Sequence, residues 1–361
     1  MTHTPRTMSF ALVCILCLAP ACTEEMLGSL GESTQAANCG QNTCGSNSPI
    51  LFGHDAAEMN QSLAGAHLAN QAGVRLVEFR DPDGIPARYQ VEDDGELVIL
   101  DGGGAVTHSG AAVVGASFVL RHDDSNSDYV LVITDYHQTL SYWIGPAESL
   151  PSYTMKYSFV GDVGLRNLCP GPYEHDPRTN SLYPHSLDVL LSTGERYQIG
   201  TRNIFDTGAA SDGWTNFACV GDGPSKMLLY RHRPDTPEND PYASPLARRQ
   251  ALLRMWAADY CGTGTSFTRH GEPLAWRDHL GMMTEGVTSS VEAIWTPEGV
   301  ACLDVPRGAD WLQDPVTKAD VESACSQAFG KTITFPSCAG FGDNDAWPDV
   351  NPTFYFKTWN P

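Results

Sequence analysis

The cysteines restrict the possible folds of this chain more than any other feature. Eleven are present, and eight of them are spread between positions 39 and 338. An even number of cysteines after position 22, in a protein of an oxidising compartment, is typical of a disulfide framework, which holds distant segments together. This set consists of Cys39, Cys44, Cys169, Cys219, Cys261, Cys302, Cys325 and Cys338.

The N-terminal segment predicts that the protein is exported. Residues 8–20 form an apolar run after Arg6, too short to be a membrane-spanning helix. The run ends in Leu-Ala-Pro-Ala-Cys at positions 18–22, an imperfect cleavage site for lipoprotein signal peptidase. We therefore expect residues 1–21 to be a lipoprotein signal peptide and Cys22 to be acylated. The alternative is ordinary cleavage near Ala21, which leaves Cys22 as a thiol.

The residues after Cys22 predict a tether between the lipid and the folded body. Residues 22–49 are polar and have no periodic apolar face. Cys39 and Cys44 lie inside this tether, where a local disulfide is favoured over a metal half-site because no second ligand pair follows nearby. Thr23 gives no inner-membrane retention signal, so we expect a lipid-anchored protein at the outer membrane or cell surface, outside the cytoplasm.

Residues 50–240 predict a β-rich domain. Short alternating or apolar runs are separated by turn sequences such as those at 81–84 and 101–104, which is the pattern of antiparallel β-hairpins. No β-α-β alternation and no Gly-rich phosphate loop are present, so a nucleotide-binding sheet is disfavoured. The expected strands are 74–79, 96–100, 116–120, 129–133 and 187–191.

Residues 241–340 predict a module with two short helices and a hairpin. The first helix should run from about Pro245 to Ala258, with Ser244 as N-cap. The hairpin joins 287–295 to 300–305, and the second helix runs from Asp314 through Ala328. The fold class that we expect is therefore α+β, mainly β, with a disulfide-stapled C-terminal module.

The last segment, residues 341–361, is an aromatic tail. We expect its aromatic side chains to be docked on the body, although an exposed aromatic strip would instead indicate a binding surface. The side chains concerned are Trp347, Phe354, Tyr355, Phe356 and Trp359.

The end of the first predicted helix carries a family resemblance. Ala258-Asp259-Tyr260-Cys261 is similar to the tetrapeptide for which the ADYC-domain proteins are named, a group of predicted lipoproteins found mostly in myxobacteria. Residues 261–264, 268–273 and 295–302 resemble further recurring segments of that family, as do the short segments ending at Cys169 and Cys219. The resemblance implies no activity, because the family has none assigned. It also implies a bridge that this chain has lost as a pair, near Met227 and Leu252 or Leu253.

The pairing of the cysteines is only partly constrained by sequence, because eight cysteines allow many connectivities. Nearness along the chain and shared elements favour Cys39–Cys44, Cys169–Cys219, Cys261–Cys302 and Cys325–Cys338. Cys261 is then a structural half-cystine. The alternative, a catalytic thiolate at Cys261, would need a basic neighbour such as His270 or Arg269.

Charge and motifs narrow the possible partners. The net charge of -21 argues against nucleic acid, whose phosphates would be repelled. No zinc-protease, paired Cys-x-x-Cys or nucleophile-elbow pattern is present, so we expect no metal and no cofactor. The acidic run 123–128 lacks the glycine of a calcium loop and is better explained as a solvated hairpin turn. The aspartates at 343, 345 and 349 are a similar case.

Two functions fit this sequence. The first is a non-enzymatic envelope or surface protein that binds an envelope ligand or protein, or serves as a structural component. The second is a hydrolase acting on an envelope glycan or peptide, with Asp259 assisted by His270, Asp278 or His279. A cavity that contains His270 and an acid with a shifted pKa would favour the hydrolase.

Overall fold

The computed structural model describes most of the chain beyond the predicted tether. The ranges are 47–61, 67–125, 127–140, 149–162, 164–175, 182–207, 211–234, 245–268, 274–278, 291–307, 316–341 and 356–359. The first described residues, Asn47 and Ser48, are buried in the fold. Cys22, Cys39 and Cys44 lie outside the described residues, so acylation and the Cys39–Cys44 bridge stay predictions.

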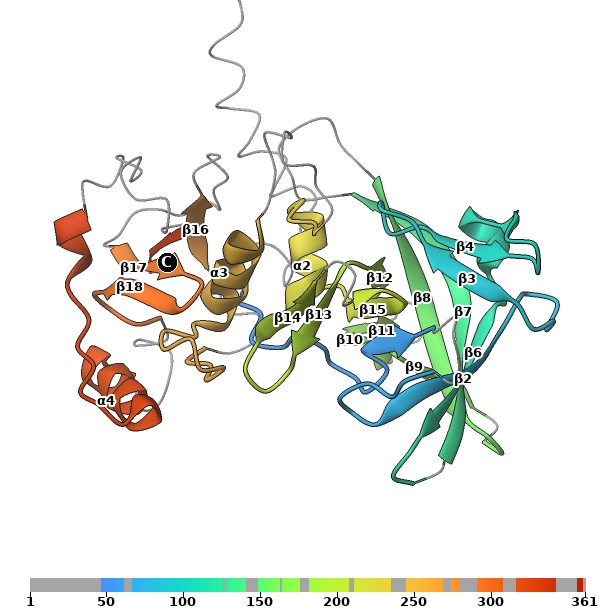
Figure 1. Ribbon diagram of the computed structural model, residues 1–361, viewed down its shortest axis with the longest axis horizontal. Coiled ribbons are helices and arrows are strands. Elements are labelled where there is room, and N and C mark those ends of the chain that lie inside the picture. The colour runs from blue at the N-terminus through green and yellow to red at the C-terminus, as the bar shows by residue number, and fades with distance from the viewer. Residues whose placement is uncertain are drawn as a thin grey trace, which may run out of the picture.

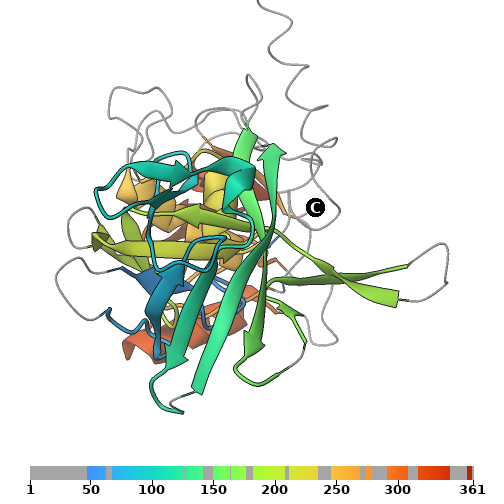
Figure 2. The ribbon, with the colours of Figure 1, turned by 90° about the vertical axis from the view of Figure 1, so that its right-hand side faces the viewer.

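One antiparallel sheet dominates the first half of the chain (Figure 1). Its order is β1–β15–β12–β8–β7–β6–β2, with β9 paired to β8. Figure 2 looks toward the end of the molecule that carries the long strands. The bounds are β1 Glu58–Asn60, β2 Val74–Arg80, β6 Ser117–His122, β7 Ser127–Leu140, β8 Ser149–Phe159, β9 Arg166–Asn167, β12 Val189–Ser192 and β15 Trp214–Cys219.

A second, three-stranded sheet covers the large one. It consists of β3 (Arg88–Val91), β4 (Leu97–Leu100) and β5 (Val106–His108). Aromatic rings fill the space between the sheets: the ring of Phe118 packs against those of Phe79, Tyr89 and Phe217 at centroid distances of 4.8, 5.2 and 5.3 Å. The Tyr153 hydroxyl accepts a hydrogen bond from the Leu97 backbone N–H at 2.7 Å, so the two sheets are also joined by a polar contact.

The expected strands are present, but their pairing differs from a simple run of hairpins. The strand β2 pairs with β6, while β3 and β4 form a hairpin of their own between them in sequence. The turn between β6 and β7 is the predicted hairpin turn at 123–128. Two further hairpins are β10 (Pro170–His175) with β11 (Leu182–Ser186), and β13 (Glu195–Gln198) with β14 (Asn203–Thr207).

The C-terminal part contains a four-stranded sheet in the order β16–β19–β17–β18. The helices α2 and α3 lie between this sheet and the large one, and α4 lies at the far end (Figure 1). The bounds are α2 Gly223–Leu229, α3 Leu246–Ala257, β16 Ala275–Asp278, β17 Val291–Thr296, β18 Gly299–Leu303, α4 Lys318–Phe329 and β19 Phe356–Trp359, with short 3-10 turns η1 Gly110–Val113 and η3 Cys338–Phe341. Among the residues with a described position, no helix is long and apolar enough to cross a membrane.

The helix predictions are corrected in three places. The helix α2 occupies a region where mostly strands and turns were expected. The helix α3 has Pro245 at its N-cap without a side-chain cap, and Ser244 lies outside the described residues. The helix α4 begins at Lys318 instead of Asp314, because Thr317 and Asp320 form a capping box that fixes the first turn there.

The helix α3 is buried on nearly every face, although it carries three arginines. Arg248, Arg249 and Arg254 are all buried. The Gln250 side chain bonds to the backbone of the β13–β14 hairpin: it accepts a hydrogen bond from the Ile204 N–H and donates one to the Arg202 carbonyl. A helix of this kind is a core element that needs an internal partner for each polar side chain.

The end of the aromatic tail is docked as expected. The strand β19 lies between β16 and β17, and its Phe356 and Trp359 side chains are buried. Trp347, Phe354 and Tyr355 lie outside the described residues.

Removal of residues 356–361 should therefore destabilise the protein. The deletion exposes two sheet edges and loses two buried aromatic side chains, each worth about 2 kcal/mol. We expect the melting temperature to fall on the order of 10 °C, measured by circular dichroism. Removal of Asn360 and Pro361 alone is the matched control, because it leaves β19 complete. Equal melting curves for both deletions would contradict the structural role of β19.

Candidate functional site

The motif tetrapeptide forms the C-terminal cap of α3. Ala258 adopts the left-handed conformation, with φ 49° and ψ 41°, a backbone state that costs a non-glycine residue free energy. The turn directs the chain back along the helix, and the Asp259 N–H donates to the Arg254 carbonyl at 2.9 Å. The Asp259 side chain is thereby brought to the side of Arg254, in the last turn of the helix.

Asp259 is fully buried and its carboxylate is saturated with donors. Arg254 Nη1 donates to Asp259 Oδ2 at 2.5 Å. The backbone N–H groups of Thr263 and Gly264 donate to the two carboxylate oxygens at 3.0 and 2.7 Å. Burial raises the pKa of Asp259 above its usual range, while Arg254 and the two N–H groups oppose that rise. Asp259 therefore holds the helix end and the following turn.

Arg254 extends this contact to two other segments. Its guanidinium donates to the Thr201 carbonyl at 2.6 Å, to the Asn203 side chain and to the Pro297 carbonyl at 3.3 Å. The pair thus connects α3 to the β13–β14 hairpin and to the β17–β18 turn. Arg254 was not singled out in the sequence. Its position, five residues before Asp259, places the two side chains together only because Ala258 turns the chain.

Tyr260 is the centre of a second buried network. Its hydroxyl donates to Glu292 Oε1 at 2.6 Å and accepts from the Arg307 N–H at 2.8 Å. The Arg307 guanidinium donates to both Glu292 oxygens at 3.1 Å, and also to the Asn47 side chain and to the Met255 carbonyl. Burial and the Glu292 carboxylate raise the pKa of Tyr260 well above its usual value, so this hydroxyl stays protonated.

Cys261 is a half-cystine, which confirms its structural role, but its partner is not the expected one. Cys261 is bonded to Cys325 on α4, and Cys302 on β18 is bonded to Cys338. The expected pairs Cys261–Cys302 and Cys325–Cys338 are therefore wrong, whereas Cys169–Cys219 is confirmed. Nearness along the chain failed as a guide because the fold brings α4, 64 residues further along the chain, to the turn that follows α3.

Two glycines allow the motif to contact the β17–β18 turn backbone to backbone. A Cβ atom on Gly262, at φ +68°, would lie 1.9 Å from the Glu298 carbonyl oxygen. A Cβ atom on Gly299, at φ +126°, would lie 2.4 Å from the Tyr260 carbonyl oxygen. Both positions exclude any side chain. The segments 261–264 and 295–302, which resemble recurring parts of one family, are thus in direct contact.

The side chains expected to assist Asp259 have no described position. His270 and His279 lie outside the described residues, as does Arg269, and the same is true of the Asp278 side chain and of the aspartates at 343, 345 and 349. The described surroundings of Asp259 are the helix, the two turns and Arg254. Asp259 and Arg254 therefore form a structural contact that holds the end of α3 to the β13–β14 hairpin and the β17–β18 turn.

The described residues form a mainly β, disulfide-linked protein. The motif at the end of α3 connects its β-rich body to its C-terminal sheet. A family model described as the ADYC domain matches residues 110–309. This match covers more than half of the chain, and the protein belongs to the ADYC-domain family. The matched range includes both the β-rich body from η1 onward and the motif. No curated protein and no solved structure matches the chain.

Two cavities lie in the β-rich body, away from the motif. The larger, about 740 Å³, lies between β2 and the three-stranded sheet. Two of its acids are used within turns: Asp81 accepts from the Asp83 and Ile85 N–H groups, and Asp101 accepts from the Gly103 and Ala105 N–H groups. These carboxylates cap turns and are not arranged as a catalytic pair.

The smaller cavity, about 460 Å³, lies between the segment before β1 and the ends of β6, β7 and β8. Its aromatic wall consists of Tyr129, Tyr157 and Phe159, and Asp55 and Asn167 contribute polar groups. The acidic run of the β6–β7 turn lies nearby, where Asp123 pairs with Arg75 and Asp128 with Arg121 at 2.7 and 2.6 Å. Sequence reasoning missed this cavity, because its residues come from five separate segments.

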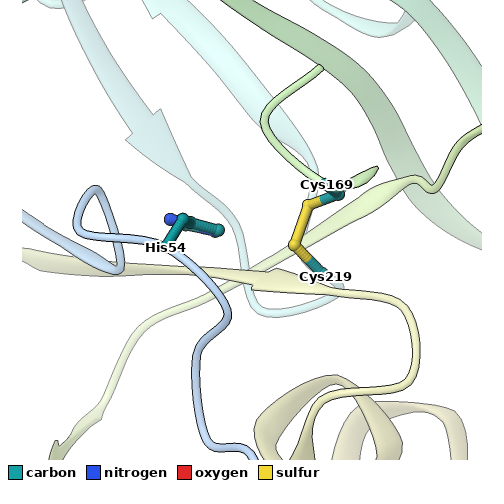
Figure 3. A group of neighbouring side chains, drawn as sticks. All are labelled: His54, Cys169 and Cys219. Carbon is teal, nitrogen blue, oxygen red and sulfur yellow. A yellow bond between two sulfur atoms is a disulfide. The ribbon is translucent and has the colours of Figure 1, made fainter. Parts of the chain in front are cut away.

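His54 lines the smaller cavity and lies beside the Cys169–Cys219 disulfide (Figure 3). One nitrogen of its ring and the two sulfur atoms are within 4.8 Å of one another. The sulfur atoms are bonded to each other, so they do not offer thiolate ligands to a metal ion. Both ring nitrogens of His54 are buried without a hydrogen-bond partner among the described residues. Burial lowers the pKa of His54 from 6.5 to about 4. The nearby Phe217 backbone raises this pKa, but by less than burial lowers it.

The Asp259→Asn change should destabilise the protein by about 3 to 5 kcal/mol, because it leaves the buried Arg254 charge uncompensated. Urea unfolding measures this loss. Asp83→Asn is the matched control, since Asp83 is exposed in the β2–β3 turn and should have an effect near zero. If Asp259→Asn unfolds at the wild-type midpoint, the structural role of Asp259 is refuted.

His54 should make stability depend on pH. Between pH 6.5 and about 4 the unfolded chain binds a proton at His54 and the folded chain does not, so the free energy of unfolding falls as the pH falls. The expected loss is about 3 kcal/mol. Urea unfolding at pH 7 and pH 4 should show a smaller loss for His54→Phe than for the wild type. Identical losses in both proteins would show that His54 is not held neutral by the fold.

Proposed function

We propose that this protein is a non-enzymatic binding protein of the cell envelope, anchored through acylated Cys22 and located outside the cytoplasm at the outer membrane or cell surface. The observation that carries the proposal is the state of Asp259. Its carboxylate is buried and fully engaged by Arg254 and two backbone N–H groups. The residue with the strongest catalytic expectation therefore supports the fold, and binding is left to the cavities of the β-rich body.

The hydrolase alternative would require His270 to share a cavity with an acid whose pKa is shifted. The acids whose pKa is raised by burial are Glu58, Asp222 and Asp259 in the described part of the chain. None of them lines either of the two cavities described above. Those cavities offer aromatic, amide and turn-capping groups, which are suited to binding.

The anchor can be tested in cells by the Cys22→Ala change. Without a thiol at position 22 no acyl chain can be attached, and we expect most of the protein to move from the membrane fraction to the soluble fraction. Fractionation followed by immunoblotting measures the distribution. Cys17→Ala is the matched control, because position 17 lies within the expected signal peptide and should leave the membrane fraction unchanged. If Cys22→Ala stays as membrane-associated as the wild type, the lipid anchor is excluded.

A further inference from the structure

The smaller cavity offers a specific set of recognition groups. It is lined by residues from the segment before β1, the start of β2, the β6–β7 hairpin, the end of β8, and the end of β9 with the residues that follow it. Resting on the proposed binding function, we propose that this cavity binds a neutral sugar ring of an envelope glycan. The inference names the ligand class of the site and depends on the aromatic wall, the unsatisfied polar groups and the charge of the cavity.

The wall is aromatic and partly open to solvent. The rings of Tyr129, Tyr157 and Phe159 contact one another at centroid distances of 5.9 to 6.3 Å. Phe159 is 40% exposed and Tyr129 is 8% exposed, so the wall reaches from the interior to the surface. A sugar ring has one face of C–H groups, which packs against an aromatic surface and removes it from water. The wall therefore provides the apolar half of a sugar site.

The polar groups of the cavity have hydrogen-bonding capacity left over. The side chains of Asp55, Tyr157 and Asn167 make no hydrogen bond or ion pair with another residue that the structure describes. A carboxylate only accepts, whereas an amide and a phenol both donate and accept. Hydroxyl groups around a sugar ring can satisfy all three, because each hydroxyl donates one hydrogen bond and accepts others. The polar half of a sugar site is thus also present.

The charge of the cavity favours a neutral ligand over an anion. No lysine or arginine lines it, and Asp55 is its one carboxylate among the described lining residues. His54 is neutral at pH 7, because burial lowers its pKa to about 4. Arg166 lies beside the cavity over the Phe159 ring, but its charge is paired with Asp162 at 3.2 Å, so an anionic glycan would meet Asp55 and a net charge of -21 with no unpaired arginine beside Phe159.

An alkylammonium ligand is disfavoured because a cation already lies over one of the three rings. Two of the ring contacts are edge to face and the third is tilted, with interplanar angles of 56° to 88°. The guanidinium of Arg166 already lies over the Phe159 ring, 5.6 Å from its centroid. The volume, about 460 Å³, is at the small end of ligand pockets and suits one or two sugar rings.

The test uses the purified full-length protein in a detergent without a sugar headgroup. Calorimetric titrations with cellotriose, chitotriose and maltotriose probe neutral sugars, and choline probes a cation. We expect saturable binding of at least one trisaccharide and none of choline. Tyr157→Ala and Asn167→Ala should each weaken that binding at least tenfold. Phe329→Ala is the matched control, because Phe329 is an exposed aromatic residue on α4 outside the cavity, and it should bind like the wild type.

Several outcomes would overturn the inference: no trisaccharide binds, choline binds instead, or both cavity variants bind as tightly as the wild type. Asn167→Ala keeps the test valid if Tyr157→Ala fails to fold. Co-sedimentation of the Cys22→Ala protein, which has no acyl chain to insert into membranes, with an isolated envelope fraction separates the two proposals. Sedimentation without binding of any trisaccharide overturns the sugar site but supports the binding function, whereas failure of both assays overturns both.

Discussion

The ion pair between Arg254 and Asp259 is the interaction on which the rest of the C-terminal structure depends. Burying two charges is expensive, and the cost is offset only where each remaining donor and acceptor finds a partner. Both side chains meet this requirement: Asp259 has three donors, and Arg254 has four acceptors on three segments. The pair can form only when the helix end, the β13–β14 hairpin and the β17–β18 turn are all in place.

Two further buried ion pairs lie around α3. Arg249 Nε donates to Glu195 Oε2 at 2.8 Å and Arg307 bonds to Glu292, and these four side chains are almost completely buried. Each pair joins the helix region to a different sheet. Charged pairs are poor sources of net stability but define one arrangement of their elements, because any other arrangement leaves a buried charge unpaired. The buried arginines thus act as alignment points between the β-rich body and the C-terminal sheet.

The described contacts of the family motif are those of a structural element. Ala258 turns the chain, Asp259 and Tyr260 each complete a buried network, and Cys261 attaches α4. Gly262 and Gly299 let two turns touch without side chains. The implied lost bridge fits this packing, because Met227 on α2 and Leu252 and Leu253 on α3 are buried in the same core.

The sequence by itself determined the local features: the β-rich body, the helix ending at the motif, the β17–β18 hairpin, the docked Phe356 and Trp359, and a structural role for Cys261. These follow from periodicity, turn residues and the parity of the cysteines, which act over short distances or by simple counting. Only the tertiary structure decided the partners of Cys261 and Cys302, the pairing of β2 with β6, and the burial of Arg254. It also brought Asp55, Tyr157 and Asn167 to one cavity from separate segments. The physical reason is that burial and pairing depend on how elements pack, and a residue such as arginine has the same appearance in sequence whether it meets water or a buried carboxylate.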